Sequence, residues 1–212
     1  MSLVLDNVEL RLADRCLLEP LSVSVEPGVI VTVQGPSGSG KSSLLAHVAG
    51  FLDQAVEARG RVSLDGVVLD DLPAHRRRVG LLFQDPLLFA HLSVAGNLLF
   101  ALPRAVRGRA ARRARVHEAL AGFGLADRAD ADPATLSGGE RARVCLLQTL
   151  LAEPRALLLD EPFASLDTAL RADIRAQVFE RLRRERLPCL LVTHDAADAA
   201  AAGGPVRRPW TR

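Results

Sequence analysis

Residues Gly35–Ser42 read Gly-Pro-Ser-Gly-Ser-Gly-Lys-Ser, and this stretch fits the phosphate-loop pattern at every fixed position. The β-branched run Val29–Val33 before it predicts a buried strand, and Ser43–Gly50 after it predicts a helix. Glycines let backbone N–H groups turn toward phosphates, and the helix dipole adds to the attraction. We therefore expect a nucleotide-binding loop made of Gly35, Pro36, Ser37, Gly38, Ser39, Gly40, Lys41, Ser42 and Ser43.

Lys41 is the only lysine among the 27 Lys and Arg residues of the chain. Lys is a compact charge on a thin stem and Arg is a planar fork, so the two are not interchangeable in a tight site. We expect Lys41 to contact the β- and γ-phosphates and the Ser42 hydroxyl to bind Mg²⁺.

Composition narrows the class of protein. The chain has 212 residues, of which 49% are apolar, which suits one α/β domain or a core domain with an inserted subdomain. No apolar run approaches the roughly 20 residues of a membrane span, and no secretory signal is visible, so we expect a soluble, cytoplasmic protein. A net charge of +2 gives no argument for nucleic acid. Three scattered cysteines are interpreted as small buried apolar residues.

The remaining pattern predicts an α/β fold with a mostly parallel sheet and flanking helices. Alternating apolar residues at the N-terminus indicate antiparallel strands, and the region from 85 to 151 indicates short helices. The basic stretch 104–115 is either a solvated helix face or a surface for a membrane or an acidic partner. The predicted elements are strands at Leu3–Leu12, Leu21–Val25, Gly60–Leu69, Gly80–Phe83, Ala156–Asp160 and Cys189–Thr193, and a helix at Thr168–Arg186.

Polar side chains follow three of these strands. Asp160 and Glu161 end an apolar strand, where ligands bind in open α/β sheets, so Asp160 is expected to hold Mg²⁺ and Glu161 to act as general base on water. His194 is expected to donate to the γ-phosphate or the transition state. Gln84 is a candidate to orient water or contact Mg²⁺. Lys41 completes the predicted catalytic set.

A second anion site is predicted at Ser137-Gly138-Gly139-Glu140. Ser137 is a candidate N-cap of the helix Ala142–Leu151, with Glu140 in a capping-box position. Two glycines leave the helix N-terminus uncovered, which favours an anion. One phosphate loop is already present, so the pattern suggests phosphates presented by another subunit; the alternative is an ordinary capped helix.

Together these motifs make the chain resemble an ABC-type ATPase domain over its whole length. They occur in that family's order, including Leu136–Glu140 and Ser165-Leu166-Asp167. The resemblance implies a P-loop NTPase core of ABC type (1–84 and 152–212) with an N-terminal antiparallel β subdomain, and a helical signature subdomain (85–151). It implies ATP and Mg²⁺ as cofactors. It also implies a head-to-tail homodimer, with ATP between the phosphate loop of one subunit and Ser137–Gly139 of the other and Asp167 at the interface.

Within the family, Leu82–Phe89 and Glu161–Asp167 resemble importer ATPases of the thiamine, iron, spermidine and sulfate kind, and subunits of the YnjD type. That resemblance implies a peripheral subunit on the cytoplasmic face of the inner membrane, bound to permease subunits, with a solute-binding protein on the far side. Leu87, Leu88 and Phe89 would contact the permease; they are alternatively subdomain core.

Three departures from the family pattern bear on function. Glu140 replaces the commoner Gln, for which we expect an altered rate. No aromatic residue precedes Phe51, although the family stacks one on adenine near Leu12, so we expect weaker nucleotide binding. Residues 196–212 are rich in Ala, Gly, Pro and Arg, and the family's terminal hairpin is expected to be missing. Two alternatives to a transporter ATPase remain. One is a non-transport ATPase acting on nucleic acid or ribosomes; such relatives carry a long coiled coil or tandem ATPase domains, and the interval Gly35–Leu136 leaves no room for a coiled coil. The other is a degenerate regulatory subunit.

Overall fold

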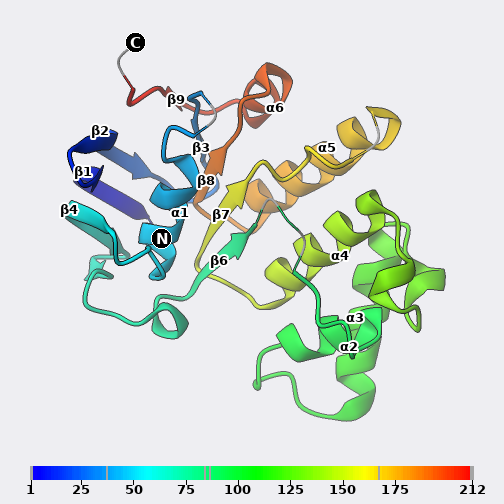
Figure 1. The fold of residues 1–212 in the computed structure, drawn as a ribbon. Coiled ribbons are helices and arrows are strands. Elements are labelled where there is room, and N and C mark those ends of the chain that lie inside the picture. Colours follow the sequence, from blue (N-terminus) through cyan, green and yellow to red (C-terminus); the bar gives the residue numbers. More distant parts are fainter. Residues whose placement is uncertain (1, 37, 84, 86, 167, 211–212) are drawn as a thin grey trace. The chain divides into compact units, whose positions relative to one another are not determined.

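The computed structural model describes residues 2–36, 38–83, 85, 87–166 and 168–210 (Figure 1). Ser37, Gln84 and Asp167, three of the predicted site residues, lie outside this set. The chain falls into two compact units. One is Met1–Leu81, Arg155–Glu161 and Arg175–Arg212; the other is Leu82–Pro154 and Pro162–Ile174. The subdomain boundaries at 85 and 151 stay a prediction.

An antiparallel sheet in the first unit has the strand order β2-β1-β4-β5. Leu3 of the central strand β1 pairs with Val25 of β2 and with Leu64 of β4. The alternation in the sequence turns one face inward, where Leu3, Leu5, Val8 and Leu10 are buried. The strands are β1 (Leu3–Leu12), β2 (Arg15–Val25), β4 (Val56–Leu64) and β5 (Val67–Val68).

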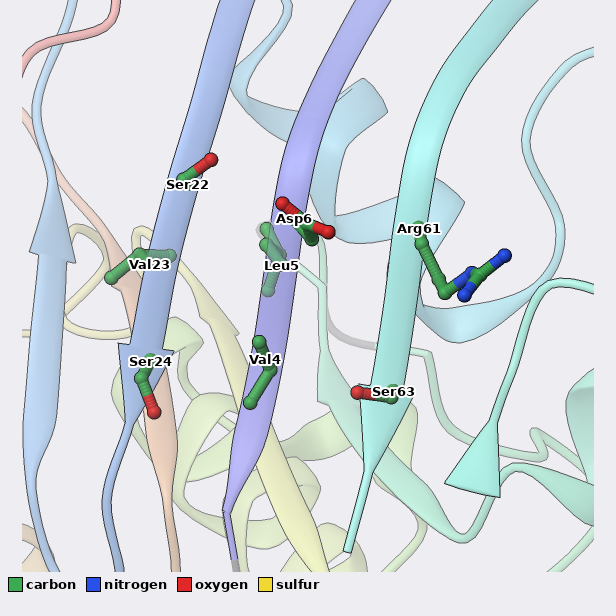
Figure 2. A pocket seen from close by; sticks show the side chains of 8 residues that line it. All are labelled: Val4, Leu5, Asp6, Ser22, Val23, Ser24, Arg61 and Ser63. Carbon is green, nitrogen blue, oxygen red and sulfur yellow. The ribbon is translucent and has the colours of Figure 1, made fainter. Parts of the chain in front are cut away.

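The opposite face of this sheet holds a shallow hollow of about 430 Å³. Figure 2 shows its lining, with Asp6 and Val4 on β1, Ser22 and Ser24 on β2, and Arg61 and Ser63 on β4. Apart from Val4, the side chains named here are polar, and strand alternation directs them to solvent. None of the predicted site residues lines it.

A second sheet has the order β6-β7-β8-β3-β9. β3 pairs in parallel with β8 and β9, and β8 pairs in parallel with β7. Every residue of β3, β7 and β8 is buried, as expected for the central strands of a parallel sheet. The strands are β3 (Ile30–Val33), β6 (Val79–Leu82), β7 (Ala156–Asp160), β8 (Cys189–Val192) and β9 (Val206–Arg207).

Two helices of the first unit pack against this sheet, α1 (Lys41–Ala49) against β7 and α6 (Ala196–Ala202) against β3. The second unit contains α2 (Val94–Ala101), α3 (Arg109–Gly122) and α4 (Gly138–Leu151), and α2 packs on both of the others. The longest helix, α5 (Thr168–Arg184), has residues in both units. Three short 3-10 turns lie at Ala74–Arg76, Ala126–Arg128 and Pro133–Thr135. Among the described residues, no helix is long and apolar enough to span a membrane.

The α/β fold class is confirmed, and three local expectations change. The sequence assigned no element to residues 196–212, but residues 196–202 form α6 and residues 206–207 form β9. The helix predicted from Ala142 begins at Gly138. Cys145 and Cys189 are buried, and burial raises the pKa of the Cys145 thiol to about 11. Cys16 is exposed, so the prediction that it is buried was wrong; it lies at the end of β2 opposite Arg11, where side chains face solvent.

Candidate functional site

The phosphate loop leaves the buried strand β3 and enters α1 at Lys41. Gly40 has φ 87°, and a Cβ there would lie 2.9 Å from the Cβ and carbonyl oxygen of Leu17. Only glycine fits such a position. The Lys41 side chain is buried and its Nζ donates to the carbonyl oxygens of Gly35 (3.0 Å) and Pro36 (2.7 Å). The loop thus holds the chain's single ammonium group against its own backbone.

A buried hydroxyl in the loop adds a second indication of a ligand. Ser39 is 9% exposed, and its Oγ has no hydrogen-bond partner among the residues that the structure describes. A buried polar atom without a partner is costly, and a phosphate oxygen is the acceptor that this loop geometry would bring to it. Ser42 and Ser43 follow in the first turn of α1, exposed and half-buried respectively.

Two acidic residues, Asp160 and Glu161, lie at the carboxyl end of β7. Asp160 is 7% exposed and its carboxylate hydrogen-bonds the side chain of Ser42. Burial raises the pKa of Asp160; the bond to Ser42 and the charge of Lys41 oppose this rise, and the charge of Glu161 adds to it. A carboxylate and a hydroxyl side by side form a hard oxygen donor set, so the residues present fit Mg²⁺.

Glu161 is 9% exposed and has φ 47°, in the left-handed region, which turns its side chain toward the end of β8. Its N–H donates to the carbonyl oxygen of Val192 (2.9 Å). Its carboxylate has three contacts there: Oε1 with the His194 ring Nδ1 (2.7 Å) and with the His194 backbone N–H (3.1 Å), and Oε2 with the Thr193 hydroxyl (3.2 Å). The His194 side chain is 69% exposed.

These contacts bring Lys41, Ser42, Asp160, Glu161 and His194 together at one edge of the sheet. The physical reason is that β3, β7 and β8 are parallel neighbours, so their carboxyl ends meet. Thr193, Asp198 and Arg175 extend this cluster and were not predicted from the sequence. The signal available for Thr193 is that it is the single polar residue at the end of the apolar run Cys189–Thr193.

The second predicted anion site lies at the start of α4, in the other unit. Ser137 caps the helix: its hydroxyl accepts from the Glu140 N–H (3.2 Å), and Glu140 accepts from the Ser137 N–H (2.8 Å). Ser137 and Gly138 are exposed, and Gly139 is half-buried. A Cβ on Gly138 would meet its nearest neighbour, the Ser165 carbonyl oxygen, at 3.9 Å.

A strand, a glycine-rich loop with one lysine, a helix, and an acid-ended neighbouring strand define the class of P-loop nucleotide-binding proteins. The comparison with known families is more specific. Residues 18–164 match the ABC transporter family, and the chain belongs to it.

Relatives support the same assignment. The chain is 48% identical over 94% of its length to the ABC transporter ATP-binding protein YnjD of Escherichia coli K12, covering 91% of that protein. It is 43% identical to the Fe(3+) ions import ATP-binding protein FbpC of Streptomyces coelicolor, over 94% of this chain and 56% of that one. It is 40% identical to the sulfate/thiosulfate import ATP-binding protein CysA of Gloeobacter violaceus, over 94% and 57%. The chain thus spans about half the length of the last two.

A solved structure shows the same fold. The ATP-bound structure of a bacterial Atm1-family ABC exporter matches with a TM-score of 0.78 and 28% identity, over 94% of this chain and 35% of that chain. The chain is therefore an ATP-binding subunit of the ABC transporter family and, like the members of that family, an ATPase.

Proposed function

We propose that this chain powers an importer of a small solute, binding and hydrolysing ATP on the cytoplasmic face of the inner membrane. The observation that carries the proposal is the meeting of Lys41, Ser42, Asp160, Glu161 and His194 at one sheet edge. The import direction rests on relatives whose names describe import ATP-binding proteins. The solute is selected by other subunits.

In this proposal the chain's own groups divide the work. Loop N–H groups and Lys41 bind the phosphates. On binding, the Lys41 ammonium gives up its hydrogen bonds to the carbonyl oxygens of Gly35 and Pro36 and donates to phosphate oxygens instead. Ser42 and Asp160 hold Mg²⁺, with Gln84 a further candidate ligand, and the ion supplies charge neutralisation on the phosphates when bound. Glu161 accepts a proton from water, and His194 donates to the phosphate.

From the Glu161–His194 contact we expect low turnover of the chain without a partner subunit. With His194 Nδ1 and the His194 N–H both on Oε1 and Thr193 on Oε2, the Glu161 carboxylate is held by protein donors. When the His194 ring turns to a phosphate, Oε1 loses the ring contact and can accept from water, while the His194 backbone N–H and the Thr193 hydroxyl still orient the carboxylate. Closure of a second subunit over the nucleotide is the event that we expect to drive this turn.

The second subunit is proposed to be another copy, placed head to tail. Its exposed Ser137–Gly139 segment would present a helix N-terminus to the phosphates, and Asp167 would lie at the same interface. Glu140 is satisfied inside its own subunit by Ser137 and Arg128, so it does not compete with this role. This supports the working-ATPase interpretation over a degenerate regulatory subunit.

Permease subunits are the proposed membrane partners, with a solute-binding protein beyond them. Leu87 is 62% exposed and Phe89 is 40% exposed, while Leu88 is half-buried. Exposed apolar side chains of this size favour the contact interpretation over the subdomain-core alternative. No nucleic-acid partner is proposed, because the basic segment 104–115 includes groups already paired with protein, such as Arg112 with the Leu99 carbonyl oxygen (2.6 Å).

The test is the Glu161→Gln variant, whose mass in solution is measured by light scattering with and without Mg-ATP. Removing the base while keeping the shape should trap bound ATP, so ATP should double the mass. The two-subunit proposal is wrong if ATP binds but the isolated variant keeps the mass of one chain, and the complex with the permease also contains only one copy of the chain.

Two variants added to Glu161→Gln sharpen this experiment. Lys41→Ala should abolish both binding and doubling. Gly138→Asp should keep ATP binding but abolish doubling, because the carboxylate repels the phosphates of the other subunit. The structure has room for this side chain, and an acidic residue in the first turn suits the helix, so folding should be unaffected.

A further inference from the structure

The single tryptophan of the chain, Trp210, lies against the phosphate loop. A Cβ added to Gly35, the first residue of the loop, would lie 2.3 Å from the Trp210 ring atom Cε3 and 2.4 Å from Cζ3. The indole face is therefore in contact with the Gly35 backbone, and no other residue type fits beneath it. The indole N–H donates to the Leu17 carbonyl oxygen (2.7 Å).

Leu17 connects the same indole to the other end of the loop. The backbone and Cβ of Leu17 are the atoms that a Cβ on Gly40 would meet at 2.9 Å. Gly35 and Gly40 are the two glycines that bound the loop, and both positions leave space for nothing larger. Trp210 contacts the first directly and the second through Leu17.

The segment that carries Trp210 is fixed along its length. The Thr32 N–H donates to the Pro205 carbonyl oxygen (2.9 Å), and the Gln34 N–H donates to that of Arg207 (2.9 Å). The Arg208 side chain donates to the Gln34 side chain (2.7 Å). These bonds attach residues 205–208 to β3 and to Gln34, which immediately precedes Gly35, so the indole is held in register with the loop.

We infer that Trp210 is a positioning residue for the nucleotide: it holds the phosphate loop in its binding shape, and its indole senses nucleotide binding. Lys41 provides the link, because its Nζ bonds the carbonyl oxygen of Gly35, the residue beneath the ring. Phosphates draw this ammonium away from Gly35, which changes the electrostatic field at the indole. The inference rests on nucleotide binding at the loop and needs neither dimerisation nor import.

The experiment uses the full chain and Mg-ADP. In the wild type, the fluorescence of Trp210 should change as Mg-ADP is added and then saturate. The Kd fitted to this change should equal the Kd that calorimetry gives. The chain has no tyrosine, so the emission reports this one ring. Lys41→Ala should abolish the response. Unchanged emission while calorimetry records binding would overturn the inference.

Variants separate positioning from general stability. Trp210→Ala should raise the Kd for Mg-ADP and the KM for ATP about fivefold and leave kcat within about twofold, as for residues that couple to a site without touching its ligand. Trp210→Phe should recover most of the affinity because it keeps the ring over Gly35. Val67→Ala, a change at a side chain 56% exposed on β5, is the control and should alter none of these values. If Trp210→Ala lowers only the thermal midpoint and leaves Kd and KM unchanged, Trp210 is merely structural and the inference fails.

Discussion

The Thr193 hydroxyl lies between two buried carboxylates, Oε2 of Glu161 at 3.2 Å and Oδ2 of Asp198 at 3.4 Å. It has one proton, so it can donate to only one of them at a time. The hydroxyl also accepts from the Asp195 N–H (3.0 Å), which fixes its oxygen. Asp198, 1% exposed, is compensated by Arg175 at 2.9 Å. Thr193 thereby orients the proposed base through Oε2, the oxygen that His194 does not contact.

Replacing Thr193 by Val tests this arrangement. The variant keeps the shape but removes the donor, so we expect kcat to fall about tenfold, the order of one hydrogen bond to a charged group. The Kd for Mg-ADP should stay unchanged, because the Thr193 hydroxyl bonds Glu161, Asp198 and Asp195 and not the side chains of the phosphate loop. Steady-state phosphate release and calorimetry measure the two quantities. Thr193→Ser should restore turnover; a Ser variant as slow as the Val variant would contradict the hydroxyl's role.

The stability of the helix α4 depends on the charge of Glu140 in its first turn. The bond from the Ser137 backbone N–H holds the pKa of Glu140 below its ordinary range, with the Ser137 hydroxyl and Arg128 acting in the same direction. The Glu140 carboxylate meets Arg128 Nε at 2.8 Å. This capping box is complete within the chain, so Glu in place of Gln at this position strengthens the helix start.

The pH dependence of Glu140→Gln follows from that lowered pKa. A carboxyl group with a lower pKa in the folded state stabilises the protein above its unfolded pKa, and this contribution is lost as the pH falls through the folded pKa. At neutral pH the wild type should therefore be more stable than Glu140→Gln; the difference should begin to shrink near the ordinary glutamate pKa of about 4.3 and vanish only below the lowered pKa of the folded state. Denaturant unfolding across this range measures it. A difference that stays constant with pH would show that the carboxylate charge contributes nothing.

α1, which begins in the phosphate loop, is held at its other end by one buried arginine. The Arg77 guanidinium donates to the carbonyl oxygens of His47 (2.7 Å) and Val48 (3.1 Å) in the last turn. Burial lowers the pKa of Arg77. A cation at a helix C-terminus also complements the dipole. The helix that carries Lys41 is thus fixed at both ends, which favours a preformed loop.

For the molecule as a whole, the exposed apolar side chains of the second unit are the proposed contact with the permease. Phe89 stacks edge-to-face with Phe100 (centroids 4.8 Å apart), and the buried Asn97 side chain bonds both the N–H and the carbonyl oxygen of Phe89. Phe89 is therefore held in place although its side chain is exposed. A rigid apolar surface costs little entropy when it binds a partner.

Leu87→Ser tests the proposed permease contact. Because Leu87 is already 62% exposed, the change should alter stability and the ATPase rate of the isolated chain only slightly. It should reduce copurification with the permease and the stimulation of ATP hydrolysis by the assembled transporter. Val67→Ser, at a similarly exposed position of the first unit, is the control. Unimpaired assembly of the Leu87 variant would place the permease contact elsewhere.

The fold class and the contiguous motifs follow from the amino-acid sequence alone. Period-two and buried apolar runs located most of the strands, β9 excepted, and Gly35–Ser42, Asp160-Glu161 and Ser137–Glu140 could be recognised because their parts are neighbours in the chain. The parallel order of strands then implied one common edge for the site. The family comparison confirmed the class.

The residues that support these motifs are visible only in the three-dimensional fold. Trp210 and Leu17 are 193 residues apart, and Glu161 and Thr193 are 32 apart. No local periodicity links such pairs; Glu161 and Thr193 meet because β7 and β8 are parallel neighbours, and the segment before Trp210 lies beside the phosphate loop because β9 pairs with β3. The last residues therefore read as an uninformative Ala, Gly, Pro and Arg tail, although they carry the ring that packs on the phosphate loop. Side-chain contacts of this kind follow from packing at long range, which the sequence pattern does not encode.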